Sequence, residues 1–470
     1  TPGPGETVPV TVVAPAQAAE VDGGVPGVVI AHGFASARQI MMGYAWKLAY
    51  AGYAVALLDF GGHGANTGRL DQSRGTLQED LDVAVGWLLE QPEVDPGRVA
   101  IAGHSLGSGA AMTAGIRRPE LFGAVIAISP TDADVGPALP PNLQLQAGSW
   151  EPRFLANAER LLDAAGGTAT GDDAFAAGRA RELVEIPRSE HITILFRDQS
   201  QTALLDWLTA TFGALPSDTG TVYRDRRPLL ALMFIAGWAL LAAGLAPLVR
   251  RLVPDDAGRG RAGLPALRAR WWWIGMIAGP AVATAALAGL ARLVPLTRLG
   301  GMLVAGAIVI WFLIAGLVWL AVGLRPGRPD LRSVGLGVGV LAILWLGVGI
   351  AVHQVALQWF VIPSRLLRWP VAGIALVPWF VAAGYADQRA SVGQRIGLLV
   401  AQSAIVVAGL GAAGALVPGL FIIVLVLPAM PLVLAAITAI GSVPRSPWSY
   451  AIGGAFFLGW LLIALFPLAG

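Results

Sequence analysis

Apolar residues follow two different patterns along this chain, and the pattern changes near residue 221. Up to about residue 212, short apolar runs alternate with amphipathic stretches, the runs being 25–31, 54–60, 99–103, 124–129, 142–147 and 183–186. Several runs are continuous, as in parallel strands that are covered on both faces. A helix is expected to start at Thr76, because Glu79 three residues later makes a capping-box pattern. Such alternation of strands and helices predicts a doubly wound, mostly parallel sheet.

The second half of the chain consists of long apolar stretches separated by short loops that contain Arg, Pro or Gly. About 20 apolar residues span the core of a bilayer. Pro428 and Pro431 predict a kink in the seventh stretch. We therefore expect an extracytoplasmic domain over residues 1–220 and an all-α transmembrane domain over 221–470, with about eight helices at 229–249, 271–292, 302–324, 334–355, 369–386, 396–416, 418–441 and 448–468.

The placement of arginine predicts how the helices are oriented in the membrane. The loops after the first, third, fifth and seventh stretches hold 12 Arg, whereas the opposite loops hold four, namely Arg292, Arg298, Arg365 and Arg368. The positive-inside rule places the richer set in the cytoplasm. The first half then lies outside the cytoplasm of a multi-pass protein of the plasma membrane. Because the chain starts at Thr1 rather than Met, we expect an export signal or signal anchor before it.

The amino-acid composition also differs between the two halves of the chain. The 470 residues are 13% charged, about half of the roughly 25% in an ordinary soluble domain. Residues 1–221 carry 13 Lys and Arg against 25 Asp and Glu, while residues 222–470 carry 19 against 5. The apolar content excludes a disordered chain. The absence of cysteine excludes a disulfide scaffold, thiol catalysis and cysteine-based metal sites.

The segment Gly103-His104-Ser105-Leu106-Gly107 is the clearest chemical motif. It follows a predicted strand and precedes a helix of small residues, which is the context that gives a G-x-S-x-G sequence its meaning. We expect Ser105 to lie on a tight, strained turn. Gly103 and Gly107 remove side chains that would clash there, and the helix N-terminus places positive potential beside the Ser105 oxygen.

Because of this motif and its context, residues 7–212 resemble the α/β-hydrolase superfamily, in its esterase, lipase and dienelactone-hydrolase-like branch. His32-Gly33-Phe34 and the segment 58–64 also match it. The resemblance implies a serine nucleophile at Ser105 and a histidine base that follows it in the chain. Of the five histidines, only His191 fits, because the other four precede Ser105 or lie in a predicted membrane helix.

The acid of the implied triad is less tightly specified. Glu151 occupies the family's acid position after the strand that ends near residue 147, and the alternatives are Asp132 and Asp134 after the preceding strand. We treat Glu190 as a surface charge. The resemblance also implies an oxyanion hole formed by the backbone amides of Phe34 and Leu106.

What the chain lacks also narrows its function. The stretch 130–141 is too short for a helical lid, and the predicted membrane helices contain no Asp or Glu, which disfavours ion-coupled transport. No nucleotide-binding or metal-ligand motif is present, so we expect no cofactor, no metal and no nucleic-acid partner.

The expected partners are the lipid bilayer and an acyl-ester or lipid-linked substrate. The sequence predicts a membrane-integrated serine esterase or lipase; the alternatives are an acyltransferase, a peptidase or amidase, and a non-catalytic sensor.

Overall fold

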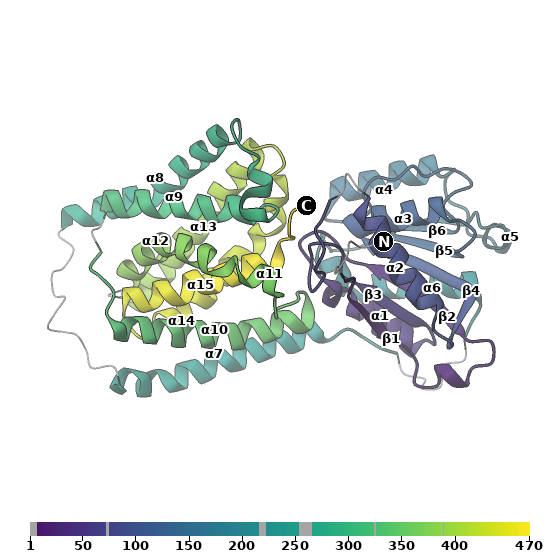
Figure 1. Cartoon of the computed structure of the whole chain (residues 1–470), viewed down its shortest axis with the longest axis horizontal. Helices are drawn as coiled ribbons and strands as arrows, with labels where there is room; N and C mark the ends of the chain where they lie inside the picture. Colours follow the sequence, from purple (N-terminus) through teal and green to yellow (C-terminus); the bar gives the residue numbers. More distant parts are fainter. Residues whose placement is uncertain (1–6, 72–74, 216–221, 253–265, 324–325, 389) are drawn as a thin grey trace. The chain divides into compact units, whose positions relative to one another are not determined.

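A computed structural model describes the chain except residues 1–6, 72–74, 216–221, 253–265, 324–325 and 389 (Figure 1). The described residues form two compact units. The first is built mainly on Thr1–Ala231 and the second on Leu232–Val352 together with Val361–Ala469. Each unit is described by itself below.

The first unit is organised around a seven-stranded sheet in the order β1-β3-β2-β4-β5-β6-β7. Strand β1 is antiparallel to β3, and every other neighbouring pair is parallel, which confirms the predicted doubly wound sheet. The strands are β1 Val10–Val13, β2 Val25–Ala31, β3 Ala54–Leu58, β4 Val94–His104, β5 Ala124–Ile128, β6 Leu143–Gly148 and β7 Arg181–Ile186.

Helices cover both faces of this sheet because successive strand residues point to opposite sides (Figure 1). In β2, Val28 and Ile30 belong to a buried core shared with helices α1 and α6, whereas Val29 and Ala31 belong to a second core shared with α2, α3 and α4. The helices are α1 Met42–Tyr50, α2 Thr76–Leu89, α3 Leu106–Arg117, α4 Pro152–Ala164, α5 Asp172–Ala176 and α6 Asp198–Phe212, with 3₁₀ turns η1 Ala18–Glu20, η2 Arg38–Met41 and η4 Thr193–Phe196.

The register of the sheet brings the carboxyl ends of the parallel strands to one edge. Ala31 at the end of β2 pairs with Gly103 of β4, and Gly148 at the end of β6 pairs with Ile186 at the end of β7. The loops that follow these strands therefore meet at one edge, where open α/β sheets place their ligands.

Two details differ from the sequence prediction. The short strand β1 was not among the predicted runs; it is only four residues long and half-buried, so it gives a weak pattern. The capping box at Thr76 is wrong, because the N-cap of α2 is Gly75, with φ of 73°, and no side chain caps the helix there. The Thr76 hydroxyl instead donates to the Asp71 carbonyl at 3.1 Å.

The second unit is helical, as predicted. Among the described residues, eight helical segments are long and apolar enough to cross a membrane. Its elements are α7 Arg227–Leu252, α8 Ala266–Leu290, η5 Leu296–Gly301, α9 Ala305–Gly323, α10 Leu331–Val355, α11 Pro363–Leu366, α12 Trp369–Asp387, α13 Val392–Leu416, η6 Phe421–Leu425, η7 Leu427–Ala429, α14 Met430–Gly441 and α15 Pro447–Leu465. The seventh predicted stretch is interrupted as expected, since η6 and η7 precede α14 around Pro428.

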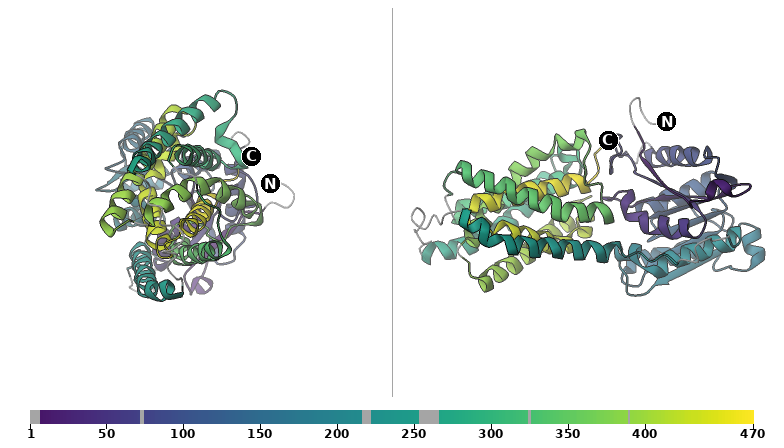
Figure 2. Two further views of the ribbon diagram at one scale, coloured as in Figure 1. Left: turned by 90° about the vertical axis from the view of Figure 1, so that its left-hand side faces the viewer. Right: turned by 90° about the horizontal axis from the view of Figure 1, so that it is seen from below.

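Small residues and tryptophans pack the interior of this helical unit. Figure 2 (left) views the ribbon of the unit along its helices. A Cβ at Gly316 of α9 would lie 2.3 Å from the backbone nitrogen of Trp379 in α12, so these two helices approach at a position that only glycine permits. Two buried indoles donate inside the unit: Trp319 Nε1 to the Trp272 carbonyl at 2.9 Å and Trp311 Nε1 to the Thr284 hydroxyl at 3.0 Å. Close packing and internal hydrogen bonds of this kind are what hold helices together in lipid.

Candidate active site

Ser105 lies on the sharp turn between β4 and α3. Its φ of 53° and ψ of −119° are sparsely populated for a residue with a side chain. Four groups donate to the Ser105 carbonyl: the Ser108 amide at 2.8 Å, the Gly109 amide at 3.4 Å, the Ser108 hydroxyl at 2.5 Å and the Thr131 hydroxyl at 3.2 Å. The strained turn is thus fixed from its carbonyl side and lifts the Ser105 hydroxyl above the sheet edge.

The two glycines of the motif leave room for this turn. A Cβ at Gly103 would lie 2.1 Å from the Gly107 carbonyl oxygen, and a Cβ at Gly107 would lie 2.6 Å from the His32 carbonyl oxygen at the end of β2. Real Cβ atoms do not approach backbone oxygens so closely. The strand, the turn and helix α3 can therefore pack together only because both positions lack a side chain.

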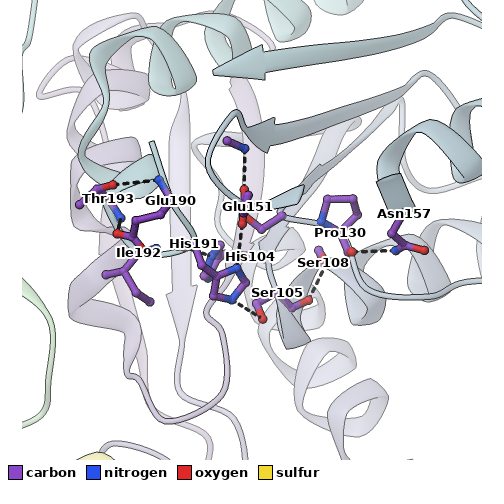
Figure 3. Close-up of polar contacts among 12 residues, drawn as sticks. His104, Ser105, Ser108, Pro130, Glu151, Asn157, Glu190, His191, Ile192 and Thr193 are labelled. Atoms are coloured by element: carbon purple, nitrogen blue, oxygen red, sulfur yellow. Dashed lines mark hydrogen bonds and ion pairs between the residues drawn. The ribbon is translucent and has the colours of Figure 1, made fainter. Parts of the chain in front are cut away.

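The structure brings Ser105, His191 and Glu151 into one chain of hydrogen bonds (Figure 3). Ser105 Oγ lies 3.0 Å from His191 Nε2, and His191 Nδ1 lies 3.0 Å from Glu151 Oε2. An ionised carboxylate only accepts hydrogen bonds, so Nδ1 carries the proton. Nε2 then presents its lone pair to the serine hydroxyl.

The Glu151 carboxylate is itself held in place. Its second oxygen accepts from the Gly148 amide at 2.6 Å and from the Ser129 hydroxyl at 2.7 Å. The Glu151 residue is 5% exposed, and His191 is 6% exposed. The Phe154 ring stacks on the imidazole with centroids 4.1 Å apart. Two donors and one aromatic face thus fix the buried Glu151 carboxylate and His191 imidazole.

Among the described residues, neither rival acid forms a hydrogen bond or ion pair with the imidazole. The Asp132 side chain is 84% exposed and pairs with Arg160, and Asp134 is also exposed. Glu190, interpreted as a surface charge, has a structural role: its carboxylate accepts from the Ile192 amide at 3.0 Å and the Thr193 amide at 2.8 Å. It thereby caps the start of η4, directly after His191.

The residues whose amides the resemblance assigns to the oxyanion hole, Phe34 and Leu106, lie on turns next to Ser105. A Cβ at Gly33 would lie 3.2 Å from Ser105 Cβ, so the turn that carries Phe34 passes directly beside the Ser105 side chain. Leu106 is the first residue of α3, where helix amides have no intrahelical acceptor. Within the part of the chain that the structure describes, neither amide donates to another protein group.

His32 fixes the orientation of the Gly33–Phe34 peptide. Its Nδ1 donates to the Gly33 carbonyl at 2.7 Å, and its Nε2 accepts from the Phe60 amide at 3.1 Å. Burial lowers the pKa of His32, so the ring stays neutral and keeps these two opposite roles. Because this hydrogen bond holds the Gly33 carbonyl, the Phe34 amide of the same peptide is held as well.

Three residues of the site escaped the sequence prediction: Ser129, Phe154 and His104. Ser129 lies directly after β5, at the same sheet edge as the other loops. This position after a predicted strand is the one signal by which the sequence could have indicated Ser129. Phe154 lies on α4, and its contact with His191 depends on the tertiary packing. His104 was assigned only to the motif, yet its Nε2 lies 2.8 Å from the His191 carbonyl oxygen.

The sheet order, the sharp turn at Ser105 and the loops at the carboxyl edge define the first unit as an α/β-hydrolase domain. Residues 26–199 match the family described as serine aminopeptidase, S33, which confirms the resemblance found from the motifs.

An uncharacterized protein of Mycobacterium tuberculosis (strain CDC 1551 / Oshkosh) is 37% identical over 94 residues, which are 20% of this chain and 33% of that relative. The chain thus spans about a third of the length of the curated relatives it matches. Similar solved structures include the dienelactone hydrolase of Anabaena variabilis, with 24% identity, coverage of 44% of this chain and 90% of that chain, and a TM-score of 0.31. The monoacylglycerol lipase of Paleococcus ferrophilus has 15% identity, coverage of 44% and 99%, and a TM-score of 0.32.

Proposed function

We propose that this protein is a membrane-integrated serine hydrolase that cleaves acyl esters through an acyl-enzyme on Ser105. One observation carries the proposal: the continuous chain from Ser105 Oγ to His191 Nε2 and from His191 Nδ1 to Glu151, with both distances 3.0 Å. A serine hydroxyl is a weak nucleophile until a base takes its proton. The chain supplies that base in the required tautomer.

In the first half-reaction, Ser105 Oγ attacks the acyl carbonyl carbon while His191 Nε2 accepts the hydroxyl proton. Glu151 stabilises the imidazolium that forms. The negative charge on the carbonyl oxygen is met by the amides of Phe34 and Leu106, and losing one such donor typically costs about 10²–10³ in rate. When the tetrahedral intermediate collapses, the ester C–O bond breaks and His191 gives its proton to the leaving alcohol.

In the second half-reaction, a water molecule attacks the acyl-enzyme while His191 Nε2 takes one of its protons. Collapse of the second intermediate releases the carboxylic acid and returns the proton to Ser105. If a bilayer alcohol or amine took the place of water, the same groups would transfer the acyl chain instead. Analysis of products with and without such an acceptor separates the two outcomes.

The substrate that we propose is a lipid or lipid-linked ester at the outer face of the plasma membrane. Among the described residues, eight long apolar helices follow the hydrolase domain, and the arginine distribution favours an extracytoplasmic position for that domain. Residues 130–141 contain no helix, so this loop provides no cap over the site. An uncapped site suits a substrate whose acyl group is presented from a membrane.

A second candidate is hydrolysis of a peptide or amide bond, which the match to a family described as serine aminopeptidase favours. The experiment assays the full-length protein in detergent against p-nitrophenyl esters of increasing chain length and against aminoacyl p-nitroanilides. Ester hydrolysis that is lost in both Ser105→Ala and His191→Ala supports the proposal. Cleavage of anilides with little ester turnover would favour the second candidate. Absence of both activities, or an activity that persists in Ser105→Ala, would overturn both candidates.

A further inference from the structure

His104, the residue directly before Ser105, hydrogen-bonds the backbone of the loop that carries His191 (Figure 3). Its side chain is buried, with 3% of the residue exposed. Its Nε2 lies 2.8 Å from the His191 carbonyl oxygen. A carbonyl oxygen only accepts hydrogen bonds, so Nε2 is the nitrogen that carries the proton and donates it.

The same imidazole also fills the space beside the turn that carries Phe34. A Cβ at Gly33 would lie 2.9 Å from His104 Nδ1, so the ring packs directly against the backbone at that position. The rings of His104 and His191 have their centroids 4.7 Å apart. His104 therefore lies between two loops, one from β2 that carries a proposed oxyanion amide and one from β7 that carries the proposed base.

The loop of His191 needs such an attachment. His191 lies in a turn between β7 and η4, outside any helix or strand. Its side chain must reach Ser105 Oγ and Glu151 at the same time. Displacement of a catalytic group by about 1 Å can cost about 10²-fold in rate.

The environment of His104 keeps its imidazole in the neutral form. Burial first, and then the neighbouring charge of His191, hold the pKa of His104 well below its ordinary value. A neutral ring presents one donor and adds no cation beside the imidazolium that forms on His191 during the reaction.

We propose that His104 is a positioning residue: its Nε2–H holds the His191 backbone carbonyl and thereby sets the reach of the His191 imidazole to Ser105 Oγ. This inference rests on the proposed serine-hydrolase function. It assigns to the second residue of the G-x-S-x-G motif a role that the motif does not specify.

The test uses a matched pair of amide variants, His104→Gln and His104→Asn, in the full-length protein. The Gln amide nitrogen can reach the place of Nε2, whereas the Asn amide nitrogen matches Nδ1 and falls short of the His191 carbonyl. We expect His104→Asn to lower kcat on a p-nitrophenyl ester about 10²-fold with KM little changed. We expect His104→Gln to stay within about tenfold of the wild type.

Two further measurements separate positioning from folding. The thermal midpoint is recorded for both variants, and the rate of fluorophosphonate labelling reports how well the base activates Ser105 without turnover. Labelling of His104→Asn should slow in parallel with kcat, while His104→Gln of equal thermal midpoint should label nearly normally. His104→Leu, which keeps volume without a donor, should behave like His104→Asn.

Equal activity of the Asn and Gln variants, whether both are normal or both impaired, would overturn the positioning role. So would a loss of activity that follows the thermal midpoint alone. Failure of the underlying function has a different signature, since Ser105→Ala would then hydrolyse esters as well as the wild type.

Discussion

Replacing Glu151 by Gln tests how the site selects the tautomer of His191. In the Gln variant the Gly148 amide, 2.6 Å from Oε1 in the native chain, still needs an acceptor, and so does the Ser129 hydroxyl. The carboxamide oxygen therefore stays at that position, and the NH₂ group takes the place of Oε2, facing His191 Nδ1. A donor there forces the imidazole proton from Nδ1 to Nε2.

With its proton on Nε2, His191 no longer accepts from Ser105. Loss of the correct tautomer in a serine triad costs about 10⁴ in kcat, so we expect kcat of Glu151→Gln to fall about 10³–10⁴-fold, or roughly 4–5.5 kcal/mol in activation free energy. The assay is steady-state hydrolysis of a p-nitrophenyl ester by the full-length protein. The fold should be little affected, because the size and two hydrogen bonds of the side chain are retained.

Asp132→Asn is the matched control, because it makes the same chemical change at a rival acid whose side chain is 84% exposed. Its kcat should stay within about twofold of the wild type, as expected for an exposed ion pair. A Glu151→Gln enzyme within tenfold of the wild type, or a large loss of activity in Asp132→Asn, would contradict the role of Glu151 as the triad acid.

Three further predictions concern folding and topology. Gly107→Ala places a methyl group 2.6 Å from the His32 carbonyl oxygen, so we expect a loss of roughly 1–3 kcal/mol in stability, seen as a lower thermal midpoint; an unchanged midpoint would contradict the tight turn. The lowered pKa values of His32 and His104 mean that the unfolded state binds protons which the folded state does not. The free energy of unfolding should therefore fall as pH drops below about 6.5, by up to about 1.4 kcal/mol per pH unit for each histidine, and His104→Gln should reduce this slope in melts at pH 7.5 and 5.5. Because the chain has no cysteine, a single Asp132→Cys should react with an impermeant maleimide on intact cells, whereas Arg328→Cys should react only after permeabilisation; the reverse pattern would invert the topology.

Much of the fold followed from the sequence because buried strands and apolar helices leave strong patterns. The run 25–31 coincides with β2, and the predicted number of long apolar helices equals the eight found among the described residues. Strand β1 was missed because it is short and only half-buried. The helix start at Thr76 was predicted, but its cap was not, because a glycine with positive φ performs that role.

Within the site, the residues that carry motifs were predictable and the residues that support them were not. Ser105 and His191 follow from the G-x-S-x-G segment and the order of five histidines. The support that Ser129 gives to Glu151, and that His104 gives to His191, joins residues 22 and 87 positions apart. No local pattern records such contacts, since they arise only when the strand ends are brought to one edge of the sheet.

Intact-mass analysis after fluorophosphonate treatment, followed by peptide mapping, shows whether Ser105 is the nucleophile. We expect one adduct per chain, located on Ser105, absent in Ser105→Ala and formed at least about 10³-fold more slowly in His191→Ala. An adduct on another residue, or equal labelling of the wild type and Ser105→Ala, would contradict this role of Ser105.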